Sequence, residues 1–471
     1  MIKYIKTLLL SSLLFFTACE GLVEGINDNP NDILISDIDA RLFLTGAMLA
    51  NAQAQVGHLN RIAGMYSGQL VGYTSLYSNI YGFSLSTVES NGVWSRVYVG
   101  TIPNVRHIRS QVPEDNLLVG ITKVIEANAI GSAALIFGDV PYTEVNNPEI
   151  EDPKFDDQIS VINAAIDLLD EAISDLAGAS SRTLSEDIYF EGDANKWTEA
   201  AYTLKARYLL NLRDYAGAYS AALNGISSEA GSMKYIPRGS PDIAEGDKNM
   251  FWTIISGSRT GDIGNKGSFL LNLVDPTNPD SRNNAKTDET ARHGYYTIED
   301  QSAASNEGII QQFEPQNMVT YAENQLILAE TAARTTDFGT ALGHLNDLRA
   351  WLNTGSGVNA NFQDQPYLYE AYTADDFTDG GIENTDGIDP TDALLREIFE
   401  ERYVSGFGMY LPFNDTRRLR VSDPNLDVPF TMNNGPTPPY AERLPYSFDE
   451  INSNENAPED PGIFAKTPVN Q

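Results

Sequence analysis

Helices that come in pairs constrain the fold of this 471-residue chain more than any other feature of its sequence. Residues 318–334 and 338–353 each carry apolar side chains at helical spacing, and a tight turn at 337–339 separates them. Residues 157–226 contain similar material. Two helices joined this closely are the unit of a tetratricopeptide-like array. Because one such pair cannot bury its apolar face alone, several pairs must stack, and the pattern predicts a mainly α fold.

The same periodicity predicts helices along much of the chain. They cover residues 38–55, 58–72, 91–111, 116–137, 157–177, 195–215, 217–226, 318–334, 338–353 and 390–405. The stretch 116–137 is apolar nearly all round, so we expect it at the centre of the core.

Helical periodicity fails between residues 227 and 315, where Gly, Asn, Asp, Ser and Pro are frequent. A loop-rich insertion of that length inside a compact domain is usually functional, so we expect residues 227–315 to face a ligand. The helical scaffold is then expected over about 38–226 and 316–420, within a domain that covers 38–471. An irregular C-terminal segment follows the helix at 390–405.

The start of the chain has the pattern of a lipoprotein export signal. Two lysines precede a short apolar run, and small residues lead to Cys19, the single cysteine of the chain. The run is too short to span a bilayer as a mature helix. We therefore predict a signal peptide over residues 1–18, lipidation at Cys19, where two or more acyl chains give stable anchoring, and a polar tether over 19–37. The alternative is a plain secretory signal with an incidental cysteine.

The chain is strongly acidic. Its formal net charge is −34, and it becomes −36 without residues 1–18, which hold two lysines and no acid. Nucleic acids and anionic lipids are polyanions, so this charge argues against both as partners. It also favours neutral glycans over sulfated or acidic ones. No later segment approaches 18 apolar residues, so we expect contact with the membrane through the lipid anchor only.

Five stretches, in their order along the chain, resemble motifs of the SusD/RagB family of outer-membrane glycan-binding lipoproteins of Bacteroidetes. They are residues 94–98 with 103–104 (WSRVY and PN), 137–144 (FGDVPYTE), 196–207 (KWTEAAYTLKAR), 321–323 with 329–330 (YAE and AE), and 400–402 with 415–418 (EER and DTRR). The ordered set is more specific than any single stretch, and together with Cys19 it spans the chain to about residue 420.

The resemblance implies a tetratricopeptide-like scaffold of about four helix pairs with an irregular, loop-rich face. It implies a lipid-anchored protein at the outer membrane that faces the cell exterior. It also implies a partner, a SusC-type TonB-dependent transporter over which the lipoprotein sits as a lid. The implied activity is the capture of oligosaccharide or polysaccharide for nutrient uptake, without catalysis.

A tyrosine cluster is the first candidate for ligand binding. Tyr73, Tyr77 and Tyr81 recur every four residues, with Asn79 between them, in a segment bounded by glycines. Sugar rings stack on aromatic faces, and tyrosine suits a site with one apolar and one wet side. The alternative is a helical aromatic stripe packed in the core.

The insertion supplies the second candidate. Trp252 lies there with Arg259 and Asp262 nearby, and the alternative is a small satellite core anchored by Phe251 and Trp252. Tyr296, which follows another tyrosine, is the third candidate. If this pair lies in a strand, the two side chains point to opposite faces and one of them at most faces ligand.

Two further residues of the insertion, Asp280 and Arg282, are suited to bonding sugar hydroxyls, although a turn-forming aspartate and a surface arginine are the ordinary interpretation. Other polar and aromatic residues are predicted to be structural. These are Trp94, Trp197 and Trp351 in the core, and Asp139, Tyr142, Arg207, Arg417 and Arg418 as buried polar pairs. A buried arginine needs a carboxylate partner, so we expect these arginines to pin helices together.

Signs of catalysis or metal binding are weak. The four histidines have no ligand spacing for zinc. An acidic run over residues 375–392 has the density of oxygen ligands that Ca²⁺ takes, but not the spacing of an EF-hand loop, so a solvated surface loop is the default. No cofactor is expected. A transporter lid that captures peptides, and a lipid-anchored glycoside hydrolase, remain as alternatives to glycan capture.

Overall fold

The computed structural model describes residues 39–243, 246–257, 259–298, 306–430 and 440–471. The predicted signal peptide over 1–18, the lipidation site Cys19 and the tether over 19–37 lie outside the described residues. The described part is mainly helical, which confirms the predicted fold class.

The α-helices are α2 (Leu42–Val56), α3 (His58–Tyr66), α4 (Ser75–Tyr81), α5 (Asn91–Ser95), α6 (Ile102–Gln111), α7 (Asn116–Phe137), α8 (Gln158–Ala177), α9 (Ala194–Asn211), α10 (Tyr215–Ala222), α11 (Met250–Ser256), α12 (Phe269–Val274), α13 (Thr290–Tyr296), α14 (Tyr321–Thr335), α15 (Phe338–Leu352), α16 (Pro390–Ser405), α17 (Leu411–Ser422) and α18 (Phe448–Ser453). A π-helical turn, η4 (Arg96–Thr101), joins α5 to α6.

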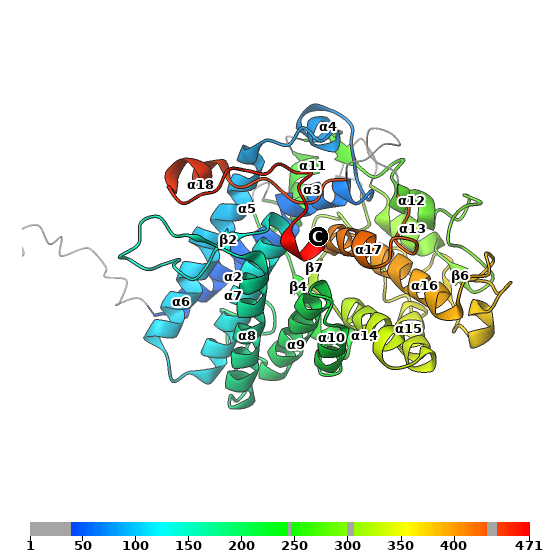
Figure 1. Cartoon of the computed structure of the whole chain (residues 1–471), viewed down its shortest axis with the longest axis horizontal. Coiled ribbons are helices and arrows are strands. Elements are labelled where there is room, and N and C mark those ends of the chain that lie inside the picture. Colours follow the sequence, from blue (N-terminus) through cyan, green and yellow to red (C-terminus); the bar gives the residue numbers. More distant parts are fainter. Residues whose placement is uncertain (1–38, 244–245, 258, 299–305, 431–439) are drawn as a thin grey trace, which may run out of the picture.

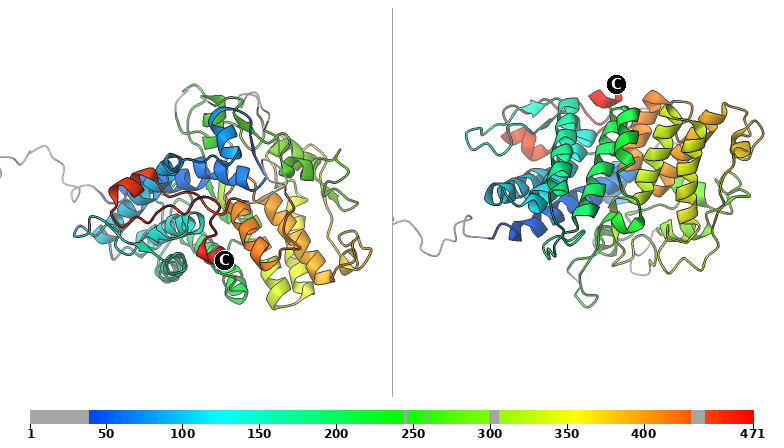
Figure 2. Two further views of the ribbon diagram at one scale, coloured as in Figure 1. Left: turned by 45° about the horizontal axis from the view of Figure 1, so that its top comes forward. Right: turned by 90° about the horizontal axis from the view of Figure 1, so that it is seen from below.

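Most of these helices stand in one continuous row. Helix α7 packs on α8, α8 on α9, α9 on α10, and α10 on α14, which in turn packs on α15 and α16. Figure 1 shows α8, α9, α10, α14 and α15 along one edge of the molecule, with α4, α11, α12 and α13 on the opposite edge. The turned views in Figure 2 show the same row, seen from below in the right-hand panel. The stacking expected from the sequence is therefore present.

Aspartate caps begin many helices of the row. The side chain of the residue before the helix accepts a hydrogen bond from a first-turn backbone N–H, which offsets the unpaired donors of a helix start. The capping residues are Asp115, Asp157, Asp193, Asp214, Asp337 and Asp389, ahead of α7, α8, α9, α10, α15 and α16. The helix starts in the row are thus fixed locally by the sequence.

Helix α7 occupies the centre of the core, as its apolar composition predicted. It is the one helix among the described residues that is long and apolar enough to cross a membrane, but 94% of its apolar window is buried inside the protein. Gly131 lets a neighbour approach closely, because a Cβ there would lie 2.3 Å from the ring of Tyr208. The Tyr208 hydroxyl donates to the carbonyl of Ala127 at 2.9 Å, which ties α9 to α7.

The remaining segments form short helices and two-residue or slightly longer strand pairs. The strands are β1 (Val71–Gly72), β2 (Val140–Pro141), β3 (Phe155–Asp156), β4 (Met233–Tyr235), β5 (Ile263–Gly264), β6 (Thr287–Asp288), β7 (Gln316–Val319) and β8 (Leu368–Tyr369). They pair antiparallel as β1–β5, β2–β3, β4–β7 and β6–β8. Three of these pairs, β1–β5, β4–β7 and β6–β8, tie residues between 227 and 315 to segments outside that range.

Helix α17 is a difference from the expected irregular tail. It runs from Leu411 to Ser422, and beside buried apolar residues such as Phe413 and Leu419 it buries five consecutive polar residues, Asn414 to Arg418. This polar run interrupts the apolar spacing that marks a helix in a sequence. Its buried charges are held by partners on other helices instead.

Two of the three arginines predicted to be buried have the expected carboxylate partner. Arg207 donates to both oxygens of Glu323 at 2.6 Å, and Arg418 donates to both oxygens of Glu330 at 2.6 and 2.9 Å. Arg417 differs, because its guanidinium bonds the carbonyls of Glu442 and Leu135 at 2.6 and 2.9 Å. Burial without a directly bonded carboxylate lowers the pKa of Arg417 to about 9.

The GDVPYTE segment is also held by hydrogen bonds, though not by an arginine–aspartate pair. Asp139 accepts from the backbone N–H of Gln158 at 2.9 Å, at the start of α8. Tyr142 donates to Glu126 at 3.2 Å, and Arg106 donates to the same carboxylate at 2.8 Å. These bonds fix the segment after α7 against α8 and α6.

Two of the predicted structural tryptophans are buried. Trp197 is fully buried, and its indole N–H donates to Asp187 at 2.7 Å. Trp94 is 5% exposed and donates to Glu450 at 3.1 Å. Trp351 is half-buried.

The acidic run over 375–392 uses several of its carboxylates for local bonds. Lys286 donates to Asp376 at 2.6 Å, Arg396 donates to Asp386 at 2.7 Å, and Asp389 caps α16. Within the described ranges, no three His, Cys, Asp or Glu side chains group as ligands for a metal ion.

Candidate ligand-binding site

Two of the sequence-predicted segments meet at the pair β1–β5. The strands pair Val71 with Gly264 and Gly72 with Ile263. Just beyond the pair, the backbone N–H of Tyr73 donates to the carbonyl of Asp262 at 2.8 Å. The structure thus joins segments that lie about 190 residues apart in the sequence.

Three of the predicted ligand-binding residues, Tyr73, Arg259 and Asp262, gather at this junction, which we call the β1–β5 surface. Arg259 Nη1 lies 3.5 Å from Asp262 Oδ2, and the side chain of Arg259 is 37% exposed. Thr74 Oγ1 donates to the other Asp262 oxygen at 2.7 Å. The half-buried ring of Tyr73 donates through its hydroxyl to the Lys266 carbonyl at 3.1 Å. An aromatic ring, a cation and a carboxylate are therefore held in one place.

Tyr77 has a different position. It is 2% exposed, and Arg61 Nε donates to its hydroxyl at 2.7 Å. Its ring packs edge-on against His58, with centroids 6.1 Å apart. Tyr77 therefore belongs to the core below the β1–β5 surface, as the aromatic-stripe alternative described, because α4 turns this side chain inward.

Charged groups also lie close below that surface. His58 bonds Glu89 at 2.8 Å. Burial lowers the pKa of His58 below its ordinary value, although the bond to Glu89 opposes the shift. The hydrogen bond from His58 lowers the pKa of Glu89, and the charge of Arg259 adds to this effect.

The other candidates of the tyrosine and tryptophan clusters vary in exposure. Asn79 is exposed, and Tyr81 is half-buried against the core. Burial raises the pKa of Tyr81. Trp252 is half-buried in α11, and the ammonium of Lys248 lies 4.9 Å from its ring centroid. Phe251 is buried in the main hydrophobic core and Trp252 packs against the same core, so the pair does not anchor a separate satellite core.

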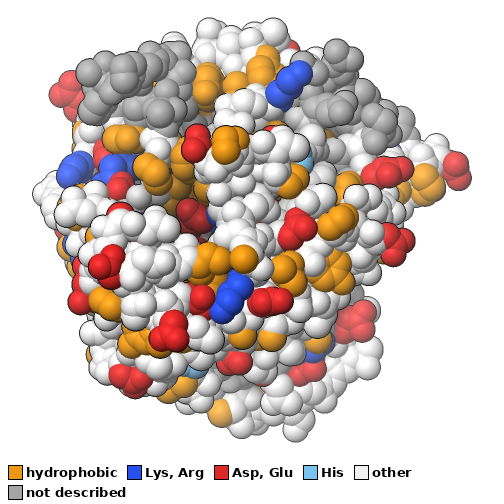
Figure 3. Space-filling view, turned by 90° about the vertical axis from the view of Figure 1, so that its right-hand side faces the viewer, with side chains coloured by type: hydrophobic (Ala, Val, Ile, Leu, Met, Phe, Trp, Pro, Cys, Tyr) orange, Lys and Arg blue, Asp and Glu red, His pale blue; other side chains and the backbone are white. Residues whose placement is uncertain are grey.

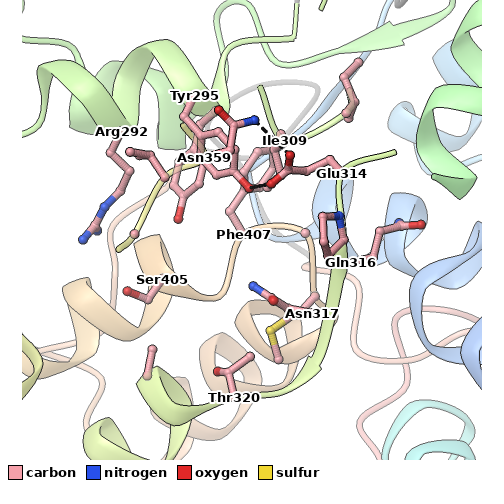
Figure 4. Close-up of a pocket in the computed structure, with 18 of the residues that line it drawn as sticks. Arg292, Tyr295, Ile309, Glu314, Gln316, Asn317, Thr320, Asn359, Ser405 and Phe407 are labelled. Carbon is pink, nitrogen blue, oxygen red and sulfur yellow. Dashed lines mark hydrogen bonds between the residues drawn. The ribbon is translucent and has the colours of Figure 1, made fainter. Parts of the chain in front are cut away.

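A cavity of about 150 Å³ lies on the inner side of β1. Leu70, which precedes β1, lines it, as does Ile298, whose carbonyl accepts a bond from the residue after β5. Other lining residues come from α3, α13, β7, α15 and the segments 356–359 and 405–409. Figure 4 shows how these side chains surround the space.

Glu314 is one of the carboxylates that line this cavity, and we call the space the Glu314 cavity. Tyr295 donates its hydroxyl proton to one Glu314 oxygen at 2.9 Å, and Asn359 Nδ2 donates to the other at 2.9 Å (Figure 4). Burial raises the pKa of Glu314 above its ordinary value, although both hydrogen bonds oppose the shift. The three side chains form one connected polar group in a wall that also carries aromatic, aliphatic and charged side chains.

Tyr296 lines the same cavity and is 5% exposed. The expected strand around it is instead the helix α13, in which Tyr295 and Tyr296 are adjacent rings with centroids 5.5 Å apart. Because neighbours in a helix are only about 100° apart, both rings reach the cavity. Burial raises the pKa of Tyr296 to about 12.

Sequence reasoning missed Glu314, Asn359 and the cavity position of Trp351. Each comes from a different segment and none belongs to a motif, so only the fold brings them together. The loop 356–359 is rich in small and polar side chains, and nothing in its sequence marked Asn359 as a residue that lines a cavity.

Arg282 differs from the expected surface arginine. Its side chain is 2% exposed and contacts the carboxylates of Glu289, Glu397 and Glu401 at 3.0, 2.9 and 2.5 Å. It is therefore unavailable for ligand, because every side of the guanidinium faces a buried acid. Asp280 is exposed and lies in a turn, where its N–H donates to Asn278.

The sequence model of the SusD-like family, described as starch-binding and associating with the outer membrane, matches residues 31–407. The chain belongs to the SusD-like family. The search of curated protein sequences returned no match.

Solved structures with the SusD-like fold superpose over most of the chain. A SusD/RagB family protein from Bacteroides thetaiotaomicron is 19% identical, with a TM-score of 0.66 over 89% of this chain and 95% of the other. A chitin-binding SusD homologue from Flavobacterium johnsoniae is 17% identical, with a TM-score of 0.66 over 91% and 98%. A SusD homologue from Bacteroides uniformis is 17% identical, with a TM-score of 0.65 over 91% and 99%. At these identities the likeness shows a shared fold.

Acidic side chains outnumber basic ones in this SusD-like chain, 65 to 31. Figure 3 shows one face, on which Asp and Glu side chains are spread widely and Lys and Arg are few. This agrees with the formal net charge of −34. An anionic ligand would have to approach against this field.

Proposed function

We propose that this SusD-like protein is a surface lipoprotein that binds a neutral glycan at the β1–β5 surface and delivers it to a SusC-type TonB-dependent transporter. The observation that carries the proposal is the grouping of Tyr73, Arg259 and Asp262 on a chain of this family. A tyrosine ring offers a face for a sugar ring, and the half-exposed Arg259, held by the buried Asp262, offers donors to hydroxyl groups. The acidic surface supports a neutral ligand.

The family description and the chitin-binding homologue support a carbohydrate ligand. Binding without catalysis fits this proposal, since Asp262 is engaged by Thr74 and Arg259 rather than opposed to a second carboxylate across a cleft. The predicted lipidation at Cys19 supports attachment to the outer membrane with the domain outside the cell. Replacement of Cys19 by alanine should release the protein from the membrane fraction.

The direct test is affinity electrophoresis of purified protein through gels that contain neutral glucans, mannans, fructans or chitin oligomers, followed by calorimetry with the glycan that retards it. Tyr73→Ala should weaken binding by ~1–3 kcal/mol if the ring is a stacking hot spot. Tyr202→Ala is the matched control, because Tyr202 is also a half-buried tyrosine but lies on scaffold helix α9.

The same incubation separates the alternatives. New reducing ends would indicate a hydrolase, and binding of peptides with no glycan retained would indicate a peptide-capturing lid. Equal affinity of Tyr73→Ala and the unmodified protein for the retained glycan would remove the β1–β5 surface as the site. Co-purification of a TonB-dependent transporter from outer membranes tests the partner.

A further inference from the structure

The size of the Glu314 cavity restricts what it can hold. Its volume is about 150 Å³. An engineered protein cavity of about this volume binds benzene, so the space holds at most one six-membered ring. A glycan of several residues does not fit inside it.

Five aromatic side chains of the described residues line the cavity beside polar and aliphatic ones. The rings of Tyr296 and Phe407 pack edge-on with centroids 5.0 Å apart, and Tyr295 packs against Tyr296. Trp351, whose ring packs edge-on against Tyr321 at 5.7 Å, lines the cavity from α15. Flat aromatic faces of this kind suit the CH face of a sugar ring.

Two fully buried polar side chains that line the cavity carry atoms without a hydrogen-bond partner. They are Arg292 Nη2 and Gln69 Oε1, on residues that are 1% and 0% exposed. The indole N–H of Trp351 is likewise unpaired. These three atoms also have almost no accessible surface, so they lie within the wall and do not meet a ligand. The half-buried side chains of Glu314, Tyr295 and Asn359 are the polar groups that a ligand in the cavity meets, and a ligand with hydroxyl groups can bond them.

The charges around the cavity favour an uncharged ligand. The other guanidinium nitrogens of Arg292 face Glu289 at 3.3 Å and Glu401 at 3.0 Å, so its positive charge is already balanced. Glu314 adds a carboxylate to the wall, and its remaining lone pairs accept hydroxyl protons. Lys234 also lines the cavity, but its ammonium pairs with Glu229. An anionic ring would therefore meet the Glu314 carboxylate with no unpaired cation among the described lining residues.

We propose that the Glu314 cavity binds a single neutral pyranose ring, either a free monosaccharide or the terminal residue of a glycan, as a subsite separate from the β1–β5 surface. The inference rests on the proposed function for the class of ligand, and on the cavity for its size. The half-exposed residues Lys234, Glu229 and Asn359, with exposed Ser356, mark the side on which the cavity meets solvent.

The test uses saturation-transfer NMR and calorimetry of the purified protein with D-glucose, D-galactose, D-mannose and N-acetyl-D-glucosamine, each alone. At least one sugar should bind saturably, and Asn359→Ala should weaken it about tenfold, since it removes a polar group and loosens Glu314. Trp351→Phe, which replaces the indole by a smaller aromatic face in the cavity wall, should also weaken it. The matched control is Asn361→Ala, because Asn361 is an exposed neighbour whose amide bonds the Glu307 carbonyl.

Thermal unfolding of each variant separates a lost contact from a lost fold. Of the two variants, Trp351→Phe changes the packing of the scaffold less. If Asn359→Ala unfolds at a lower temperature than the unmodified protein, the sugar affinity of Trp351→Phe is the measurement that tests the cavity. No saturable binding of any of the four sugars, or equal affinity in the unmodified protein and Trp351→Phe, would overturn the proposal.

A second comparison separates the two sources of the ring and the two sites. Linear oligomers of the bound sugar are compared with a cyclic oligomer that has no chain end. If Asn359→Ala weakens the linear oligomer but not the cyclic one, a chain terminus enters the cavity; if it weakens only the monosaccharide, the free sugar is the ligand. Monosaccharide binding that Asn359→Ala weakens and Tyr73→Ala does not is binding in the Glu314 cavity. Monosaccharide binding that only Tyr73→Ala weakens lies at the β1–β5 surface and would overturn the proposal, so failures at the two sites give different results.

Discussion

Glu330 ties the helical row to α17, and its removal should be among the most costly single changes in the chain. The carboxylate is fully buried, and Arg418 on α17 donates to both of its oxygens at 2.6 and 2.9 Å. Arg334 donates to the same group at 3.2 Å, one turn along α14. We predict that Glu330→Gln keeps the shape of the side chain and leaves two buried guanidinium groups without their shared counterion.

The magnitude follows from the pKa of the group. Burial alone would raise the pKa of Glu330, but the charges of Arg418 and Arg334 outweigh it and lower the pKa from 4.5 to about 2. A difference of about 2.5 pKa units corresponds to about 3 kcal/mol of stability at neutral pH. Removing one partner of a buried ion pair typically costs ~3–5 kcal/mol. Both arguments place the loss for Glu330→Gln at about 3 kcal/mol or somewhat more.

Urea unfolding followed by circular dichroism measures this loss. The matched control is Glu171→Gln. Glu171 is likewise a glutamate in an ion pair, with Lys123 at 2.9 Å, but its side chain is 62% exposed. An exposed pair contributes ~0–1 kcal/mol, so the control should stay close to the unmodified protein. If Glu330→Gln costs no more than Glu171→Gln, the argument that α17 is held by buried charge is wrong.

The remaining predictions concern pH and packing. Because the folded-state pKa of Glu330 is depressed, its contribution is present above about pH 4.5 and is lost as pH falls to about 2, so the gap between Glu330→Gln and the unmodified protein should close in acid urea titrations. Trp197→Phe removes a fully buried indole N–H bond and should cost ~1–3 kcal/mol in thermal unfolding. Gly131→Ala places a methyl group 2.3 Å from the ring of Tyr208 and should also cost ~1–3 kcal/mol of stability. Gly343→Ala meets nothing within 4 Å and should stabilise the protein by up to ~1 kcal/mol. Equal effects of the two glycine changes on thermal unfolding would contradict the packing argument.

The helical row was predictable because each of its helices carries local signals. Residues 116–137 were predicted as a core helix from apolar composition, and α7 has these bounds. Aspartate caps and apolar periodicity act over a few residues, so they survive in the sequence as patterns. Helix α17 has neither signal, because partners such as Glu330, distant in sequence, hold its buried polar face.

The candidate site was only partly predictable for the same reason. Residue type and sequence neighbours predicted a role in ligand binding for Tyr73, Arg259 and Asp262. The two strands that bring these residues together are only two residues long. Strands that short carry no alternation, so the sequence holds no sign of their pairing. The same residue-type argument placed Tyr77 with the ligand, and there the helical spacing of α4 turned the ring inward.

Buried charge also connects the scaffold to the Glu314 cavity. Arg292 reaches the cavity wall while Glu289 and Glu401 hold two sides of its guanidinium. Arg282 contacts the same two carboxylates at 3.0 and 2.5 Å and Glu397 at 2.9 Å, so these arginines and glutamates form one buried network. Breaking a member of such a network is costly, which restricts the motion of the others. The network therefore holds α13 in place, and α13 also carries the cavity residues Tyr295 and Tyr296. Side chains that are fixed in advance bind a ligand without a further ordering cost.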